Sequence, residues 1–192
     1  MERFWLAFIP LFVAFDVIGL LPLYWALANG QPPARRRQAV DSAVVLAFLV
    51  ALAFLWVSGW IFRLMGIEMA DVMIAGGIIV FGIALNDLLH PEKHPWASAE
   101  AIGVVPLGVP LIVGPAVLAT ILLTRQQYGL RPTLWALSLN VLLTWTALQI
   151  ADRLMERVGK GGARVISKVS SLVLAAFAVM LVRQGVTAVL GR

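Results

Sequence analysis

The chain has 192 residues, of which 61% are hydrophobic, with a mean hydropathy of +0.92 and no cysteine. Apolar usage in soluble domains is about 45–50% even when glycine is counted, so this composition excludes a soluble globular domain. The pI near 10.4 and the net charge of +5 are compatible with nucleic-acid binding, but the basic residues lie between apolar runs. That distribution is typical of membrane topology. We therefore predict a protein that contacts the lipid bilayer and no nucleic acid, and the lack of cysteine excludes disulfides and thiol chemistry.

Six apolar segments follow one another along the chain, each close to the ~20 residues that cross a bilayer. We place them at about 4–27, 40–62, 72–89, 101–124, 134–150 and 166–190. The first imitates a signal peptide, but its amino-terminal region is not net positive and its apolar run is too long. We expect it to be a retained membrane segment. The predicted fold is an all-α membrane protein with one transmembrane domain over residues 1–192.

Segment 101–124 contains a stretch that cannot form one continuous helix. Its prolines at Pro106, Pro110 and Pro115 each lack an N–H group and crowd the carbonyl four residues back. We predict that a half-helix begins at Gly114 and Pro115, because proline suits the first helical turn. Its free N–H groups, with Ala116 beside them, would suit a substrate carboxylate. The alternative is a kinked helix in which small residues serve close packing.

Segment 4–27 is interrupted in a corresponding way. Pro10 and Pro22 mark the predicted break, and Asp16 and Gly19 lie between them. Pro10 and Gly19 correspond to Pro106 and Gly114 at an offset of 95 to 96 residues. Broken apolar segments at matching places in two halves are the best sequence indication of a transport site.

The repeat extends to other positions, since Gly76-Gly77 matches Ser170-Ser171 at an offset of 94 residues. Two repeats, 1–92 and 98–192, would each hold three segments. Because three is odd, the second repeat must insert upside down, so six helices form two inverted three-helix repeats with helices 1 and 4 broken. The loops after segments one, three and five hold more Lys and Arg than the other side. The positive-inside rule therefore predicts that both termini are non-cytoplasmic.

Asp16 is the carboxylate that lies well inside a predicted span, where an ionisable group is a functional candidate by default. It could bind a coupling Na⁺ or H⁺, or meet a substrate ammonium group; the structural alternative is a helix cap at the break. Asn140 and Thr144 share one helical face and are further candidates for substrate binding. For these two, and for Ser170 and Ser171, we favour interhelical hydrogen bonds and packing.

The sequence resembles the MarC family of bacterial inner-membrane proteins, which is named after a multiple-antibiotic-resistance locus. The resemblance is strongest over residues 105–115, 74–80 and 158–168. It implies six membrane segments, a relationship to LysE-type exporters, and, by one branch of the family, cation-coupled transport of small neutral amino acids such as glycine and alanine. Many members carry Asp-Pro-x-Gly-Asn in the first segment, where this chain has Asp16-Val-Ile-Gly-Leu20. Asp16, Gly19, Gly114 and Pro115 match the family, the asparagine amide is absent, and the usual Gly-Pro-Gly is Gly-Pro-Ala.

Two hypotheses follow for the function. The first is a secondary transporter of small solutes with no cofactor, in which a zwitterion lies between the two breaks. The second is a non-transporting membrane protein with a scaffold or assembly role, whose breaks are packed dry, with no polar cavity at mid-depth. We expect no enzyme, because no nucleophile–base pair or metal site is visible in the spans. His90 and His94, beside prolines in a loop, are not a metal pair. The apolar surface permits a homodimer but does not demand one.

Overall fold

The computed structural model describes residues 2–28, 31–89 and 112–191, and these residues form helices and no strand. The helices are α1 (Glu2–Phe15), α2 (Val17–Ala28), α3 (Pro33–Met65), α4 (Met69–Leu89), α6 (Pro115–Tyr128), α7 (Leu130–Gln149) and α8 (Ala151–Leu190). The prediction of an all-α protein is therefore confirmed for the part of the chain that the structure describes.

Four stretches of helix are long and apolar enough to cross a membrane: Glu2–Trp25, Pro33–Ser58, Ala70–Leu89 and Gly161–Leu190. A fifth candidate is the pair Leu130–Gln149 and Ala151–Gly159, which is bent by 57° at Ile150. The described residues thus hold four spans, or five if the bent pair counts as one. The chain is a multi-pass membrane protein.

The first span is broken at Asp16, as predicted, but not at its prolines. Asp16 alone separates α1 from α2, and its backbone has a φ of 45°, in the left-handed region. Pro10 lies inside α1 and Pro22 inside α2, so the prediction that these two prolines mark the break is wrong. Proline is tolerated inside a membrane helix because neighbouring groups and local adjustments satisfy the freed backbone.

The second predicted break is described on one side only. Helix α6 begins at Pro115, with Gly114 as its N-cap, which confirms the predicted start of a half-helix. With 14 residues, α6 is about 21 Å long, shorter than the ~30 Å hydrocarbon core. Pro106 and Pro110, like His90 and His94, lie outside the described residues.

Helices extend further into the basic stretches than predicted. Helix α3 begins at Pro33 rather than near residue 40, and α8 begins at Ala151 rather than near residue 166. Arg and Lys are good helix formers, and their long side chains reach the headgroup region from a helix end, so charge alone does not stop a helix there. Helix α8 bends at Gly159, whose φ of 70° is left-handed.

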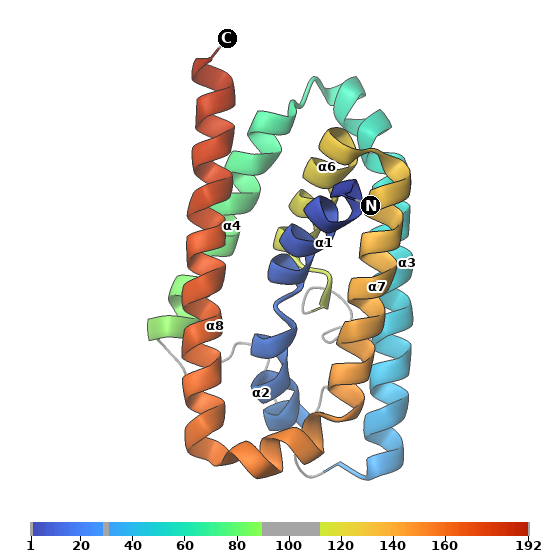
Figure 1. The fold of residues 1–192 in the computed structure, drawn as a ribbon, viewed down its shortest axis with the longest axis vertical. Helices are drawn as coiled ribbons and strands as arrows, with labels where there is room; N and C mark the ends of the chain where they lie inside the picture. Colours follow the sequence, from blue (N-terminus) through green and yellow to red (C-terminus); the bar gives the residue numbers. More distant parts are fainter. Residues whose placement is uncertain (1, 29–30, 90–111, 192) are drawn as a thin grey trace.

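The helices run between two ends of the molecule (Figure 1). One end, here called the N-terminal end, holds the start of α1, the end of α8, and the α3–α4 and α6–α7 turns. At the opposite end, here called the Arg36 end, α2 is linked to α3 and α7 bends into α8. The first turns of α8 run across the Arg36 end below α2 before the helix turns up along α4 (Figure 1).

Small residues set the closest helix contacts. A Cβ on Gly77 would lie 2.8 Å from the Ala178 carbonyl oxygen, and one on Gly185 would lie 2.9 Å from that of Ala70, so α4 and α8 approach each other closely. A Cβ on Gly76 would lie 2.8 Å from that of Ala119 on α6. Gly76 and Gly77 are therefore sites of close helix packing. Helix α4 thus holds α6 and α8 together beside the broken first span.

Candidate functional site

Asp16 forms the junction between α1 and α2 and caps the second helix. The backbone N–H of Gly19 donates a hydrogen bond of 3.2 Å to Asp16 Oδ1. Aspartate is among the best N-cap residues because its carboxylate accepts from the unpaired N–H groups of the first turn. The structural alternative stated for Asp16 is therefore present in the fold, and a functional role must be additional to it.

Ser170 on α8 donates a second hydrogen bond to the same Asp16 Oδ1 across the bundle. Ser170 is 7% exposed, and its hydroxyl links the first half of the chain to the second. This agrees with the interhelical role that the sequence suggested, but the assignment of Ser170 to the Asp16 site was missed. The sequence shows that Ser170 corresponds to Gly76 in the repeat. It does not show that Ser170 contacts Asp16, because that contact depends on how α8 packs against α2.

Gly19, which corresponds to Gly114 in the repeat, lies in the first turn of α2 and, unlike Gly114, does not precede the start of a helix. Its lack of a side chain is nonetheless required. A Cβ at Gly19 would collide with the Asp16 carboxylate and would lie 2.7 Å from Ser170 Oγ. Gly19 therefore leaves the space in which the Asp16–Ser170 contact forms.

A cavity of about 280 Å³ adjoins Asp16 between the α1–α2 junction and α8. Its polar lining residues are Asp16 and Ser170. The remainder of the lining is apolar: Phe12, Val13, Val17, Ile18, Val165, Ile166, Val169 and Val173. Ile18 and Val169 are more than half exposed within membrane spans, so the cavity reaches the lipid-facing surface. A carboxylate in such an apolar cavity has lost most of its hydration. A cation or a proton donor beside it is therefore favourable.

The start of α6 offers a different chemistry. Gly114 has an extended backbone, with φ −90° and ψ −176°, and no side chain caps the helix. Proline at the first helical position donates nothing, so the following N–H groups carry the positive end of the helix dipole. Ala116 is buried, and its carbonyl accepts a hydrogen bond of 2.7 Å from the Thr120 hydroxyl. Among the described residues, those lining the Asp16 cavity do not include Gly114, Pro115 or Ala116.

Asn140 and Thr144 are fully buried on one face of α7, as their spacing predicted. Asn140 Nδ2 donates to the carbonyl oxygens of Ala136 at 2.9 Å and of Phe8, on α1, at 3.4 Å. Thr144 Oγ1 donates to the Asn140 carbonyl oxygen at 2.8 Å. Asn140 Oδ1 is buried without a hydrogen-bond partner in the described structure. These contacts favour the packing role for Thr144 and leave one acceptor of Asn140 unused.

Comparison with known proteins agrees with this helical membrane architecture. The family model described as "MarC family integral membrane protein" matches residues 1–190. The chain belongs to the MarC family. A relative in Bacillus subtilis, the UPF0056 membrane protein YvbG, is 31% identical over 93% of this chain and 91% of its own length. The UPF0056 inner membrane protein YhgN of Escherichia coli K12 is 28% identical over 94% of each chain.

The resemblance found in the motifs is thus confirmed for the whole length of this MarC-family chain. The UPF0056 membrane protein MJ0972 of Methanocaldococcus jannaschii is 31% identical over 93% of this chain, so the similarity extends to archaea. No solved structure matches the chain. The names of these relatives describe membrane proteins and state no activity.

Proposed function

We propose that this MarC-family protein is a secondary transporter of small solutes and not an enzyme. Small neutral amino acids such as glycine and alanine are the substrates to test first, with Na⁺ or H⁺ as the coupling ion. The observation that supports the proposal is the interruption of the first candidate span at Asp16, where the carboxylate adjoins a cavity. Ionisable groups within membrane spans are costly and mark ion or substrate pathways.

The depth of the Asp16 break supports the proposal. Helix α1 has 14 residues and α2 has 12, so they are about 21 Å and 18 Å long. A break between two segments of similar length lies near the middle of the bilayer, where transporters with broken helices bind substrate and ion. Helix α6, also 14 residues long, would bring the Gly114–Pro115 start to a similar depth.

Six spans in two inverted repeats remain part of this proposal. The packing of α4 supports the repeat, because Gly76 contacts α6 while its counterpart Ser170, 94 residues later, contacts the α1–α2 junction. A pseudo-two-fold axis that exchanges the halves would exchange these two contacts. In this arrangement Asp16 serves the amine or coupling cation, and the α6 N–H groups serve the substrate carboxylate.

We also propose that the protein lies in the inner (plasma) membrane; the Escherichia coli relative YhgN is named an inner membrane protein. The Arg36 end would face the cytoplasm. Exposed arginines at Arg35, Arg37 and Arg153 flank that end, and loops rich in Lys and Arg stay on the cytoplasmic side.

The competing function is a scaffold in which Asp16 serves only as a helix cap. The hydrogen bond from Gly19 favours that function. The space beside Asp16 favours the transporter, and Asp16 and Ser170 are the two polar residues of its otherwise apolar lining. The two readings differ in what happens when the charge is removed and the cap is kept.

The test is uptake of labelled glycine, alanine and serine into proteoliposomes with an imposed Na⁺ or H⁺ gradient. Asparagine caps helices as well as aspartate does, so Asp16→Asn keeps the cap but removes the charge. We expect gradient-driven uptake by the wild type and its loss, by at least about a hundredfold, in Asp16→Asn with unchanged folding. Uptake that survives in folded Asp16→Asn would contradict the role of Asp16. No uptake of any solute by folded wild-type protein would favour the scaffold.

A further inference from the structure

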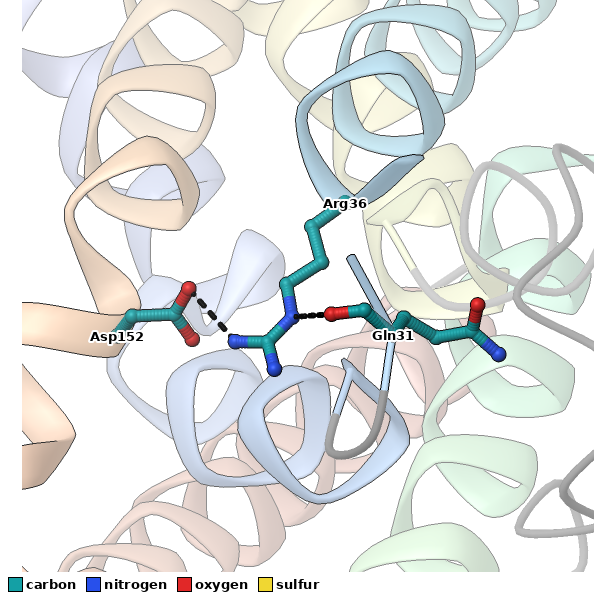
Figure 2. Close-up of polar contacts among 3 residues, drawn as sticks. All are labelled: Gln31, Arg36 and Asp152. Carbon is teal, nitrogen blue, oxygen red and sulfur yellow. Dashed lines mark hydrogen bonds and ion pairs between the residues drawn. The ribbon is translucent and has the colours of Figure 1, made fainter. Parts of the chain in front are cut away.

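Arg36 holds three parts of the chain together at the Arg36 end of the molecule. Its Nη1 forms an ion pair of 2.9 Å with Asp152 Oδ2 on the first turn of α8, and its Nε donates a hydrogen bond of 2.8 Å to the Gln31 carbonyl oxygen. Figure 2 shows the guanidinium between these two acceptors. Arg36 belongs to α3, Gln31 to the link after α2, and Asp152 to α8. One side chain therefore joins the first half of the chain to the second.

The position of Arg36 is unfavourable for its own helix. It lies in the first turn of α3, where the helix dipole favours acidic residues, and that turn contains none. Asp152, in contrast, lies in the first turn of α8, where the dipole favours a carboxylate. The favourable interactions of the Arg36 charge therefore come from its contacts with other elements and not from the dipole of α3.

A second contact joins the same two regions. Asp41 Oδ1 on α3 accepts hydrogen bonds from Trp145 Nε1 at 2.7 Å and from Gln149 Nε2 at 2.8 Å, both on α7. Residues 31–41 are thus joined to residues 145–152 by three polar contacts. Tyr24 on α2 is buried and interacts electrostatically with both Arg36 and Asp152. The ion pair therefore lies next to α2, the second helix of the first span.

The corresponding positions of the repeat, on the opposite end, do not carry an equivalent pair of charges. At the repeat offset of 95 residues, Gln31 and Arg36 correspond to Gln126 and Arg131, which lie at the N-terminal end. Asp152, however, corresponds to Val57 at this offset, or to Ser58 at the offset of 94 residues that relates Gly76 to Ser170, and neither residue carries a charge. The ion pair is therefore not repeated at the corresponding positions of the sequence.

The segment that carries Asp152 is bounded by two bends. The chain turns by 57° at Ile150, and Gly159 has a left-handed backbone that ends the short helical piece. This piece, 151–158, crosses the Arg36 end below α2 (Figure 1). Residues at element ends that absorb backbone changes are where hinge motions concentrate.

We propose that the Arg36–Asp152 ion pair is a latch that keeps the Arg36 end closed, so that breaking it opens a path from that end toward Asp16. The proposal rests on the proposed transport function, because alternating access requires one end to open while the other is closed. The 151–158 piece is the moving part, with Ile150 and Gly159 as its hinges.

The test measures thiol labelling and needs no substrate, so it is independent of whether transport is found. The chain has no cysteine, hence a single introduced cysteine reports without background. Leu21→Cys places the reporter on the Arg36 side of Asp16, and Ala7→Cys places a control on the other side; both positions are buried. Maleimide labelling of each is compared in wild-type, Arg36→Gln and Arg35→Gln backgrounds, where Arg35 is an exposed neighbour of equal charge.

We expect Arg36→Gln to raise the labelling rate of Leu21→Cys by roughly fivefold, the shift expected for a partly exposed ion pair worth about 1 kcal/mol. Labelling of Ala7→Cys, and all labelling in Arg35→Gln, should stay unchanged. The double exchange Arg36→Asp with Asp152→Arg should restore slow labelling. Equal increases at both cysteines would show that the pair only holds the fold together, and no increase would show that it holds nothing closed; either result overturns the latch.

Discussion

The two predicted helix breaks differ in their chemistry. At the first, a single residue with a left-handed backbone separates two helices, and its carboxylate receives hydrogen bonds from Gly19 and Ser170. At the second, α6 begins with a glycine and a proline, and no side chain caps its N–H groups. The first break therefore presents a negative charge, and the second presents backbone donors without a side-chain cap. Under the proposed function, these two chemistries suit the amine and the carboxylate of a zwitterion.

The largest expected effect on stability comes from filling the space at Gly19. We expect Gly19→Val to lower the free energy of unfolding by about 3 kcal/mol or more, because the side chain would displace the Asp16 carboxylate from Ser170. Gly82 is the matched control, since a Cβ there would meet nothing within 4 Å. Gly82→Val should change stability by less than about 0.5 kcal/mol. Thermal unfolding in detergent compares them, and equal losses would mean that the first break has no special packing.

The next effect isolates the hydrogen bond that reaches the first break from α8. Ser170→Ala removes a donor to a carboxylate and should cost about 2 kcal/mol, within the range for hydrogen bonds to charged groups. Ser171→Ala is the control, because the Ser171 hydroxyl donates to the Ser167 carbonyl oxygen of its own helix. Its loss should cost well under 1 kcal/mol. A Ser170 variant as stable as the Ser171 variant would remove Ser170 from the site.

The smallest effect on stability, and the sharpest test of the second break, is Gly114→Ser. A serine cap should stabilise α6 by a few tenths of a kcal/mol, because its hydroxyl accepts from a free N–H group. If those N–H groups bind a substrate carboxylate, transport should nevertheless fall. Unfolding and uptake are measured on the same preparation. A variant that is more stable and transports as well as the wild type would show that the α6 start does not bind substrate.

The sequence alone determined the membrane class, the helical fold, the family, the Asp16 interruption and the Pro115 start. These features depend on hydropathy and on the local chemistry of a few residues. Both are properties of the sequence and do not require tertiary contacts. Local signals were insufficient where tertiary contacts decide the outcome. Pro10 and Pro22 did not break their helices, and the Arg-rich stretch at the start of α3 became helical.

Only the tertiary structure paired Asp16 with Ser170, made the space at Gly19 necessary, and joined Arg36 to Asp152. Ser170 is 154 residues from Asp16 in the chain, so no periodicity or motif connects them. Which helix faces which, and at what depth, depends on how whole helices pack against each other. Small residues allow the close approach, and the few polar side chains that need partners then fix the register.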